Sequence, residues 1–156
     1  MKIKEMQLET LLPLIKEQLS SGKSVRFMPR GVSMLPMLRQ GIDSVTLSPV
    51  KGLLEKYDLP LYRRDNGKFV LHRVVRAENG VYTAIGDNQF IYEHDLRHDQ
   101  IIAVVTSFSR GDKDIPVSSL PYQIYCRFWC LSRPVRHFMR RAVGKLKRIA
   151  RRIFKG

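Results

Sequence analysis

Between residues 23 and 117 the apolar residues fall in short runs, several of which alternate with polar positions, as in strands that bury one face. The two ends of the chain differ. Apolar residues recur every three or four positions at 10–21 and again from Ser132 towards Phe154, which predicts a helix at each end. Thr10 is the predicted N-cap of the first helix, and Gly22 ends it. We expect strands at 23–28, 43–47, 59–64, 68–77, 81–85, 101–109 and 115–117.

Asn-Gly dipeptides separate the predicted strands in the middle of the chain. Asn66-Gly67 joins 59–64 to 68–77, and Asn79-Gly80 joins 68–77 to 81–85. Both residue types adopt positive φ readily, so this pair favours the tightest hairpin turns. A chain of 156 residues is long enough for one domain with a buried core. The predicted fold is therefore mainly β, with an N-terminal helix and a basic amphipathic C-terminal helix.

The charge of the chain is concentrated at its C-terminus. The formal net charge is +14. Residues 121–156 contain 11 Lys and Arg and no Asp or Glu, which leaves 17 basic against 14 acidic residues in 1–120. The body is thus nearly balanced, at +3, and the basic character belongs to the end of the chain. We predict a domain at 1–120 followed by a basic tail at 121–156.

Segment 132–155 of this tail predicts a helix with one apolar and one basic side. Its apolar positions are Val135, Phe138, Met139, Ala142, Val143, Leu146, Ile149, Ala150 and Ile153. Its basic positions are Arg136, Arg140, Arg141, Lys147, Arg148, Arg151, Arg152 and Lys155. We prefer a helix that lies in an anionic membrane surface with its apolar side down. The alternatives are a helix that packs on the body, and one that binds nucleic acid or an acidic partner.

Two further observations bear on location. The first residues, 1–5, lack the apolar core of a secretory signal peptide, because an acidic residue intervenes. The best apolar run, 124–131, is short and is interrupted by Arg127, so we expect no transmembrane helix. We expect a cytoplasmic or peripherally membrane-associated protein. Cys126 and Cys130 lie one helical turn apart; we interpret them as half-buried thiols, with S-acylation near a membrane as the alternative.

Ser33 is the candidate nucleophile. It lies between Gly31 and Pro36, which favour a tight turn. A serine hydroxyl needs a base within hydrogen-bonding distance, and such a turn exposes its oxygen and aims backbone N–H groups at a developing oxyanion. His72, placed in the middle of the predicted strand 68–77, is the candidate base, because imidazole titrates near neutral pH. Taken singly, a serine in a Gly-x-Ser turn and a histidine in a strand are each more often structural than catalytic.

Three motifs of this chain resemble the signal peptidase superfamily (peptidase families S24 and S26), nearest its archaeal and endoplasmic-reticulum type. They are Gly31-Val32-Ser33-Met34-Leu35-Pro36-Met37-Leu38, Leu71-His72-Arg73-Val74 and Gly86-Asp87-Asn88. The resemblance covers residues 23–105 and implies an all-β, partly coiled sheet fold. It also implies a serine endopeptidase with Ser33 as nucleophile and His72 in place of the bacterial catalytic lysine.

The acid that completes such a site is assigned less directly. In the relatives the aspartate follows the Gly-Asp-Asn motif by several residues, in an acidic pair. Here that region reads Tyr-Glu-His-Asp, and we choose Asp95, with Glu93 and Asp87 as alternatives. The resemblance fails at Gly31, where many relatives carry a hydroxyl residue that helps to bind the oxyanion. Only backbone N–H donors then remain.

We expect neither a cofactor nor a metal. His94 and His98 are four residues apart and have acidic neighbours, which on a helix would form a metal-binding face. We interpret this segment instead as an exposed, charged loop, because no stronger ligand signature accompanies it.

The sequence therefore predicts a serine endopeptidase of signal-peptidase-like type that makes limited cuts in a peptide or protein precursor, at or near a membrane. The alternative is a catalytically impaired relative that acts as a binding module attached to a membrane or to nucleic acid. A self-cleaving, repressor-like domain would need a DNA-binding helix-turn-helix, and one N-terminal helix does not supply it.

Overall fold

A computed structural model describes the backbone of residues 8–153 and the side chains of residues 10–145. Its elements are α1 (Leu8–Ser20), β1 (Val25–Phe27), β2 (Val45–Ser48), β3 (Pro60–Arg63), β4 (Phe69–Leu71), β5 (Arg73–Glu78), β6 (Val81–Ile85), β7 (Glu93–Arg97), η1 (His98–Gln100), β8 (Ile101–Arg110), β9 (Lys113–Pro116), α2 (Leu120–Leu131) and α3 (Arg133–Ile153). The fold is mainly β, as predicted. Helix α1 starts before Thr10, so Thr10 is not its N-cap.

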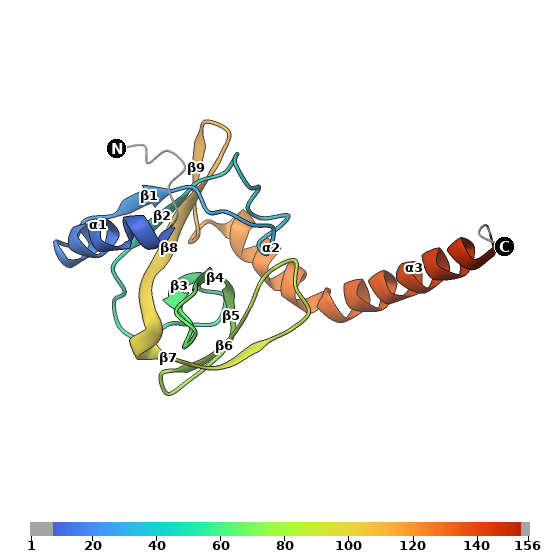
Figure 1. The fold of residues 1–156 in the computed structure, drawn as a ribbon. Helices are drawn as coiled ribbons and strands as arrows, with labels where there is room; N and C mark the ends of the chain where they lie inside the picture. Colours follow the sequence, from blue (N-terminus) through green and yellow to red (C-terminus); the bar gives the residue numbers. More distant parts are fainter. Residues whose placement is uncertain (1–7, 154–156) are drawn as a thin grey trace.

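The strands form two antiparallel sheets (Figure 1). The larger sheet has the order β1-β2-β8-β3-β4, with β9 also paired to β8. The smaller sheet has the order β5-β6-β7. Its first hairpin turns at Asn79 and Gly80, whose φ values are 48° and 79°, and this confirms the tight turn predicted from that dipeptide. Consecutive hairpins thus account for most of the body.

Two hydrophobic clusters hold the sheets in place. Three apolar residues of α1, including Ile15, pack with strands of the larger sheet and with buried residues of the segment that follows β1. The second cluster lies against the smaller sheet and includes Tyr62 from β3 and Tyr82 from β6. Helix α1 ends at Ser20, just before the predicted stop at Gly22, whose φ of 74° permits the chain reversal before β1. The first cluster therefore joins the N-terminal helix to the larger sheet, and the second joins the larger sheet to the smaller one.

The strand predicted at 68–77 is in fact two strands that belong to different sheets. Leu71, at the end of β4, pairs with β3 in the larger sheet, whereas Arg73 begins β5 in the smaller sheet. His72 is the one residue between them. Its assignment to the middle of a strand was wrong, because alternation continues through the crossover and gives no sign of it. The crossover brings His72 between the two sheets, where it is buried.

The charged segment that follows residue 92 is a strand rather than the predicted exposed loop. Strand β7 pairs with β6 at the edge of the smaller sheet, where charged side chains reach solvent. Its register shifts between Glu93 and Leu96, so that two residues, His94 and Asp95, lie opposite Thr83. Asp95 has a φ of 57°, as residues in bulges often do. The bulge hides the alternation by which the sequence would have predicted a strand.

The segment predicted as a single basic tail contains two helices. Helix α2 belongs to the body, because Tyr122 and Cys126 lie in the main core cluster. Helix α3 begins at Arg133, next to the start predicted at Ser132, and extends away from the rest of the molecule (Figure 1). Pro134 separates the two helices, since it has no N–H to donate to the preceding turn. The end predicted for this helix, 154–155, lies outside the described residues. Among residues 8–153, no helix combines the length and apolarity needed to cross a membrane.

Candidate active site at Ser33 and His72

Ser33 lies in an irregular segment that connects β1 to β2. Met34, Met37 and Leu38 of this segment are buried in the main core, while Ser33 stays partly exposed. Gly31 has a φ of 97°, a conformation that a residue with a side chain rarely adopts. The buried residues therefore anchor the turn from one side and leave the serine at the surface of a cavity.

That cavity brings the two principal candidates together. It has a volume of about 230 Å³, and Ser33 and His72 both line it. The rest of its lining consists of Pro29, Arg30, Gly31, Met34, Leu38, Arg64, Phe69, Val70, Leu71 and Gln89. In the described part of the chain no hydrogen bond joins Ser33 Oγ directly to the His72 ring. Catalytic hydrogen bonds often tighten only when substrate binds, so a shared cavity is the informative observation.

His72 is 2% exposed and is held through one ring nitrogen. Nδ1 lies 2.8 Å from Oε1 of Glu93 and 3.2 Å from the hydroxyl of Tyr62. An ionised carboxylate can only accept hydrogen bonds, so this contact requires the proton of a neutral imidazole to be on Nδ1. Nε2 is then the unprotonated nitrogen, which is the form that a general base needs.

Glu93 is held in its ionised form. Arg64 donates two hydrogen bonds to its carboxylate, the one from Nε at 2.7 Å. Burial by itself would raise the pKa of Glu93, but the hydrogen bonds from Arg64 and His72 outweigh it and lower that pKa to about 2. Burial and the nearby Glu93 charge raise the pKa of Tyr62 well above its ordinary value, so the phenol stays protonated. His72 therefore faces a permanent negative charge.

The preferred acid, Asp95, is not in contact with His72. Its side chain is exposed, and within the described residues no hydrogen bond or ion pair joins it to the site. The bulge in β7 is the physical reason, because it breaks the regular alternation of side chains between Glu93 and Asp95. The carboxylate that contacts His72 is that of Glu93, which the sequence left as an alternative.

Asp87, the other alternative, is buried elsewhere. Its carboxylate accepts two hydrogen bonds from Arg73, at 2.8 Å from Nε and 2.7 Å from Nη2, and both side chains have zero exposure. Burial opposes the charge on Arg73, but the Asp87 carboxylate raises the pKa of the guanidinium well above its usual value. The same guanidinium donates to Tyr122 Oη at 2.9 Å and approaches Met37 Sδ at 3.1 Å. Sequence reasoning missed this role of Arg73, because its partner Asp87 lies 14 residues away in the chain.

The Gly-Asp-Asn motif packs directly on the serine turn. The backbone N–H of Asn88 donates to the carbonyl oxygen of Ser33 at 2.8 Å, and its side-chain amide donates to the carbonyl oxygen of Val32 at 3.2 Å. A Cβ atom at Gly86 would lie 2.6 Å from that same Ser33 oxygen, so this position excludes any side chain. The three sequence motifs are therefore in mutual contact and fix the position of Ser33.

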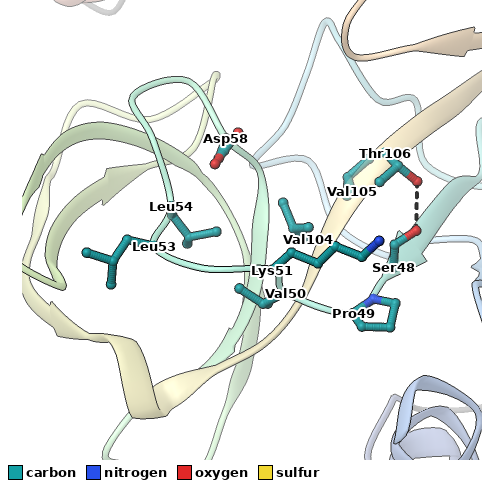
Figure 2. Close-up of a pocket in the computed structure, with 10 residues that line it drawn as sticks. All are labelled: Ser48, Pro49, Val50, Lys51, Leu53, Leu54, Asp58, Val104, Val105 and Thr106. Atoms are coloured by element: carbon teal, nitrogen blue, oxygen red, sulfur yellow. Dashed lines mark hydrogen bonds between the residues drawn. The ribbon is translucent and has the colours of Figure 1, made fainter. Parts of the chain in front are cut away.

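A second cavity lies on another part of the body, between the segment after β2 and strand β8 (Figure 2). It has a volume of about 380 Å³ and is lined mainly by aliphatic residues, with Lys51 and Asp58 as its charged members. The hydroxyls of Ser48 and Thr106 bond to each other at 3.0 Å. No histidine is found among the described residues that line it, and within those residues no hydrogen bond joins either hydroxyl to Lys51 or Asp58.

His94 and His98, which the sequence offered as a possible metal-binding face, contact different residues in the structure. His98 Nδ1 is 2.9 Å from the hydroxyl of Tyr82, and His94 Nδ1 is 3.5 Å from the hydroxyl of Thr83. The two histidines therefore have different protein partners.

No protein-family model matches this chain, and no curated protein matches it significantly.

Proposed function

We propose that this protein is a serine endopeptidase of signal-peptidase-like type, which makes limited cuts in a peptide or protein precursor. The observation that carries the proposal is the arrangement around one cavity: Ser33 and His72 line it together, and Glu93 binds the far nitrogen of the His72 ring. A hydroxyl, an imidazole and a carboxylate in this sequence of contacts are the elements of nucleophilic acyl transfer. Glu93 replaces Asp95 as the proposed acid.

The proposed reaction begins at Ser33. Its Oγ forms a bond to the carbonyl carbon of the scissile peptide, the carbonyl electrons move to the oxygen, and the Oγ proton passes to Nε2 of His72. When the tetrahedral intermediate collapses, the C–N bond breaks and the imidazolium gives that proton to the leaving amine. Water then repeats the sequence at the acyl-enzyme and releases the acid product. Glu93 stabilises the imidazolium throughout by its negative charge.

The oxyanion formed in this reaction needs hydrogen-bond donors. Gly31 has no side chain to offer, so the proposed donors are backbone N–H groups of the serine turn. Asn88 and Gly86 support this assignment indirectly, because they hold the Ser33 backbone in place. A donor set of this kind costs no reorganisation during the reaction, since a buried framework fixes it beforehand.

We further propose membership of the signal peptidase superfamily, with His72 in the position of the bacterial lysine. Support comes from the contacts among the three motifs that carry the resemblance. Arg73 and Asp87 form a buried ion pair between the second and third motifs, and Arg73 also contacts Met37 of the first. The first two motifs line one cavity, and the third packs against the serine turn through Asn88, which a random coincidence of short motifs would not be expected to produce. The superfamily's partly coiled sheet fold is part of the same proposal.

A second candidate function is that of a catalytically impaired relative that serves as a binding module. The observation that favours it is the combination at Ser33: Oγ lacks a hydrogen bond to His72 in the described structure, and Gly31 removes one oxyanion donor. The two functions differ in one measurable property, which is whether Ser33 reacts covalently.

Labelling with a fluorophosphonate probe tests the proposal. Wild type should react at a rate that falls to background in Ser33→Ala and by about a hundredfold or more in His72→Ala. Ser48→Ala removes a hydroxyl at the second cavity and serves as the matched control, with unchanged labelling. If wild type and Ser33→Ala were both labelled only at the background rate, the proposal of a serine endopeptidase would be overturned and the binding module favoured. Labelling that survives His72→Ala would remove His72 from the mechanism.

A further inference from the structure

Eight large apolar side chains of α2 and α3 point into solvent and form what we call the apolar ridge. Its members are Leu120, Ile124, Phe128, Leu131, Val135, Phe138, Met139 and Val143. Each exposes between 49% and 76% of its surface. Single exposed apolar residues are common, but a continuous row of this length is characteristic of an interaction surface.

The ridge is continuous across the junction of the two helices. Its members recur every three or four residues from Leu120 to Val143, and Leu131 and Val135 keep that spacing on either side of Ser132. The opposite side of the same helices faces the body, where Tyr122, Cys126 and Arg133 are buried. The ridge therefore points away from the body, and no element within residues 8–153 covers it. Helix α3 itself extends away from the other elements (Figure 1).

Helix α3 is also strongly basic in sequence. Helix α3 contains nine Lys and Arg, and residues 121–156 contain no Asp or Glu to pair with them. Arg136 and Arg140 lie against the faces of Trp129 and Phe90, which holds them beside the ridge at the base of the helix. The partner of this surface must supply apolar contacts along one side and negative charges along its borders.

We propose that the apolar ridge binds an anionic lipid surface, with α3 lying in the plane of the membrane. A lipid surface supplies an apolar layer and a row of negative headgroups at adjacent depths, and long Arg and Lys side chains reach from the first to the second. Nucleic acid offers the charges but no apolar layer. A second copy of this chain would bring two sets of nine positive charges together, which is unfavourable.

The proposed surface is directly attached to the loop beside Ser33. Trp129 Nε1 donates to the carbonyl oxygen of Asp87 at 3.0 Å, and Arg133 Nη1 donates to the carbonyl oxygen of Gln89 at 3.0 Å. Gln89 in turn lines the Ser33 cavity. Lipid binding by the ridge would hold this cavity close to the membrane surface. The lipid proposal stands whether or not Ser33 is reactive, since it depends only on α2 and α3.

Co-sedimentation of the full chain with vesicles tests this proposal. Vesicles of phosphatidylglycerol and phosphatidylcholine are compared with vesicles of phosphatidylcholine only. The ridge variant Leu131→Asp/Phe138→Asp is compared with Ile42→Asp/Leu53→Asp, which changes two similarly exposed apolar residues of the body and alters the charge equally. Trp129 is the only tryptophan of the chain, so its quenching by brominated lipid reports insertion independently. Circular dichroism checks that each variant is folded.

We expect wild type to bind the anionic vesicles and the ridge variant to bind at least tenfold more weakly, with the control within about twofold of wild type. Each charge that Arg140→Gln or Arg141→Gln removes should weaken binding by roughly fivefold. Equal binding by the ridge and control variants would overturn the proposal and leave simple electrostatic adsorption. A lipid-independent dimer that the ridge variant dissociates would also overturn it, in favour of a second copy. Tight nucleic-acid binding that depends on the ridge, without vesicle binding, would overturn it likewise.

Discussion

Nδ1 of His72 lies 2.8 Å from Oε1 of Glu93, and this contact determines how the ring can act. Because a carboxylate only accepts hydrogen bonds, Glu93 keeps the proton on Nδ1 and leaves Nε2 as a base. Glu93 is itself fixed by Arg64, which lines the Ser33 cavity. The orientation of the base thus depends on Arg64, which directly follows β3 of the larger sheet, and on Glu93, which begins β7 of the smaller sheet.

Glu93→Gln should slow covalent labelling of Ser33 by about a hundredfold or more. The amide keeps the shape of the side chain but removes the negative charge, and it can donate a hydrogen bond that favours the wrong tautomer of His72. Asp95→Asn changes the neighbouring carboxylate on the same strand and should leave the rate within about twofold. If Asp95→Asn had the larger effect, the acid would be Asp95 and the contact seen at Glu93 would be structural.

The depressed pKa of Glu93 predicts how stability depends on pH. Its pKa is about 2 in the folded protein and 4.5 in its ordinary state, so the folded form binds the proton less tightly than the unfolded form. The stabilisation is present above about pH 4.5 and is lost as the pH falls towards 2. Its size is on the order of 2 kcal/mol, reduced by partial exposure of the carboxylate.

Urea unfolding of wild type and Glu93→Gln between pH 3 and pH 7 measures this effect. The difference in free energy of unfolding between the two proteins should shrink as the pH falls, because the amide of the variant does not titrate. A constant difference across that range would show that Glu93 is not stabilised in its ionised form.

Alternation and turn residues were sufficient to predict most of the strands. The Asn79-Gly80 hairpin and the long strand β8 lie where the sequence placed them. Interactions that depend on pairing between distant strands were not predictable in this way. The crossover at His72 leaves alternation intact, so the sequence cannot distinguish one long strand from two strands in different sheets. The crossover places His72 in a buried position that the alternation of apolar and polar residues did not indicate.

The acid illustrates the same limit at the level of one side chain. Glu93 and Asp95 are two residues apart, so a regular strand would put them on one face. The bulge separates them, and only the paired strand β6 reveals it. The buried role of Asp87 was equally invisible, since its partner Arg73 lies 14 residues away and looks like any charged strand residue. Motif spacing could identify the candidates but could not choose among them.

Breaking the buried ion pair should destabilise the fold without removing a reactive group. Asp87→Asn leaves the Arg73 charge buried without its carboxylate, which costs about 3–5 kcal/mol. Glu78→Gln breaks the ion pair of Arg76, in which both side chains are exposed, and should cost less than about 1 kcal/mol. Thermal unfolding of the two variants gives the comparison. Near-equal costs would mean that the Arg73–Asp87 pair does not hold the motifs together.

Gly86→Ala should displace the backbone of Ser33. The new Cβ would lie 2.6 Å from the carbonyl oxygen of Ser33, a backbone atom that cannot move without moving the nucleophile. We expect a loss of about 1–3 kcal/mol in stability and at least a tenfold fall in the labelling rate of the folded protein. Gly144→Ala is the control, because no heavy atom lies within 4 Å of the added Cβ in helix α3. It should leave labelling unchanged; normal labelling in Gly86→Ala as well would mean that the third motif does not position Ser33.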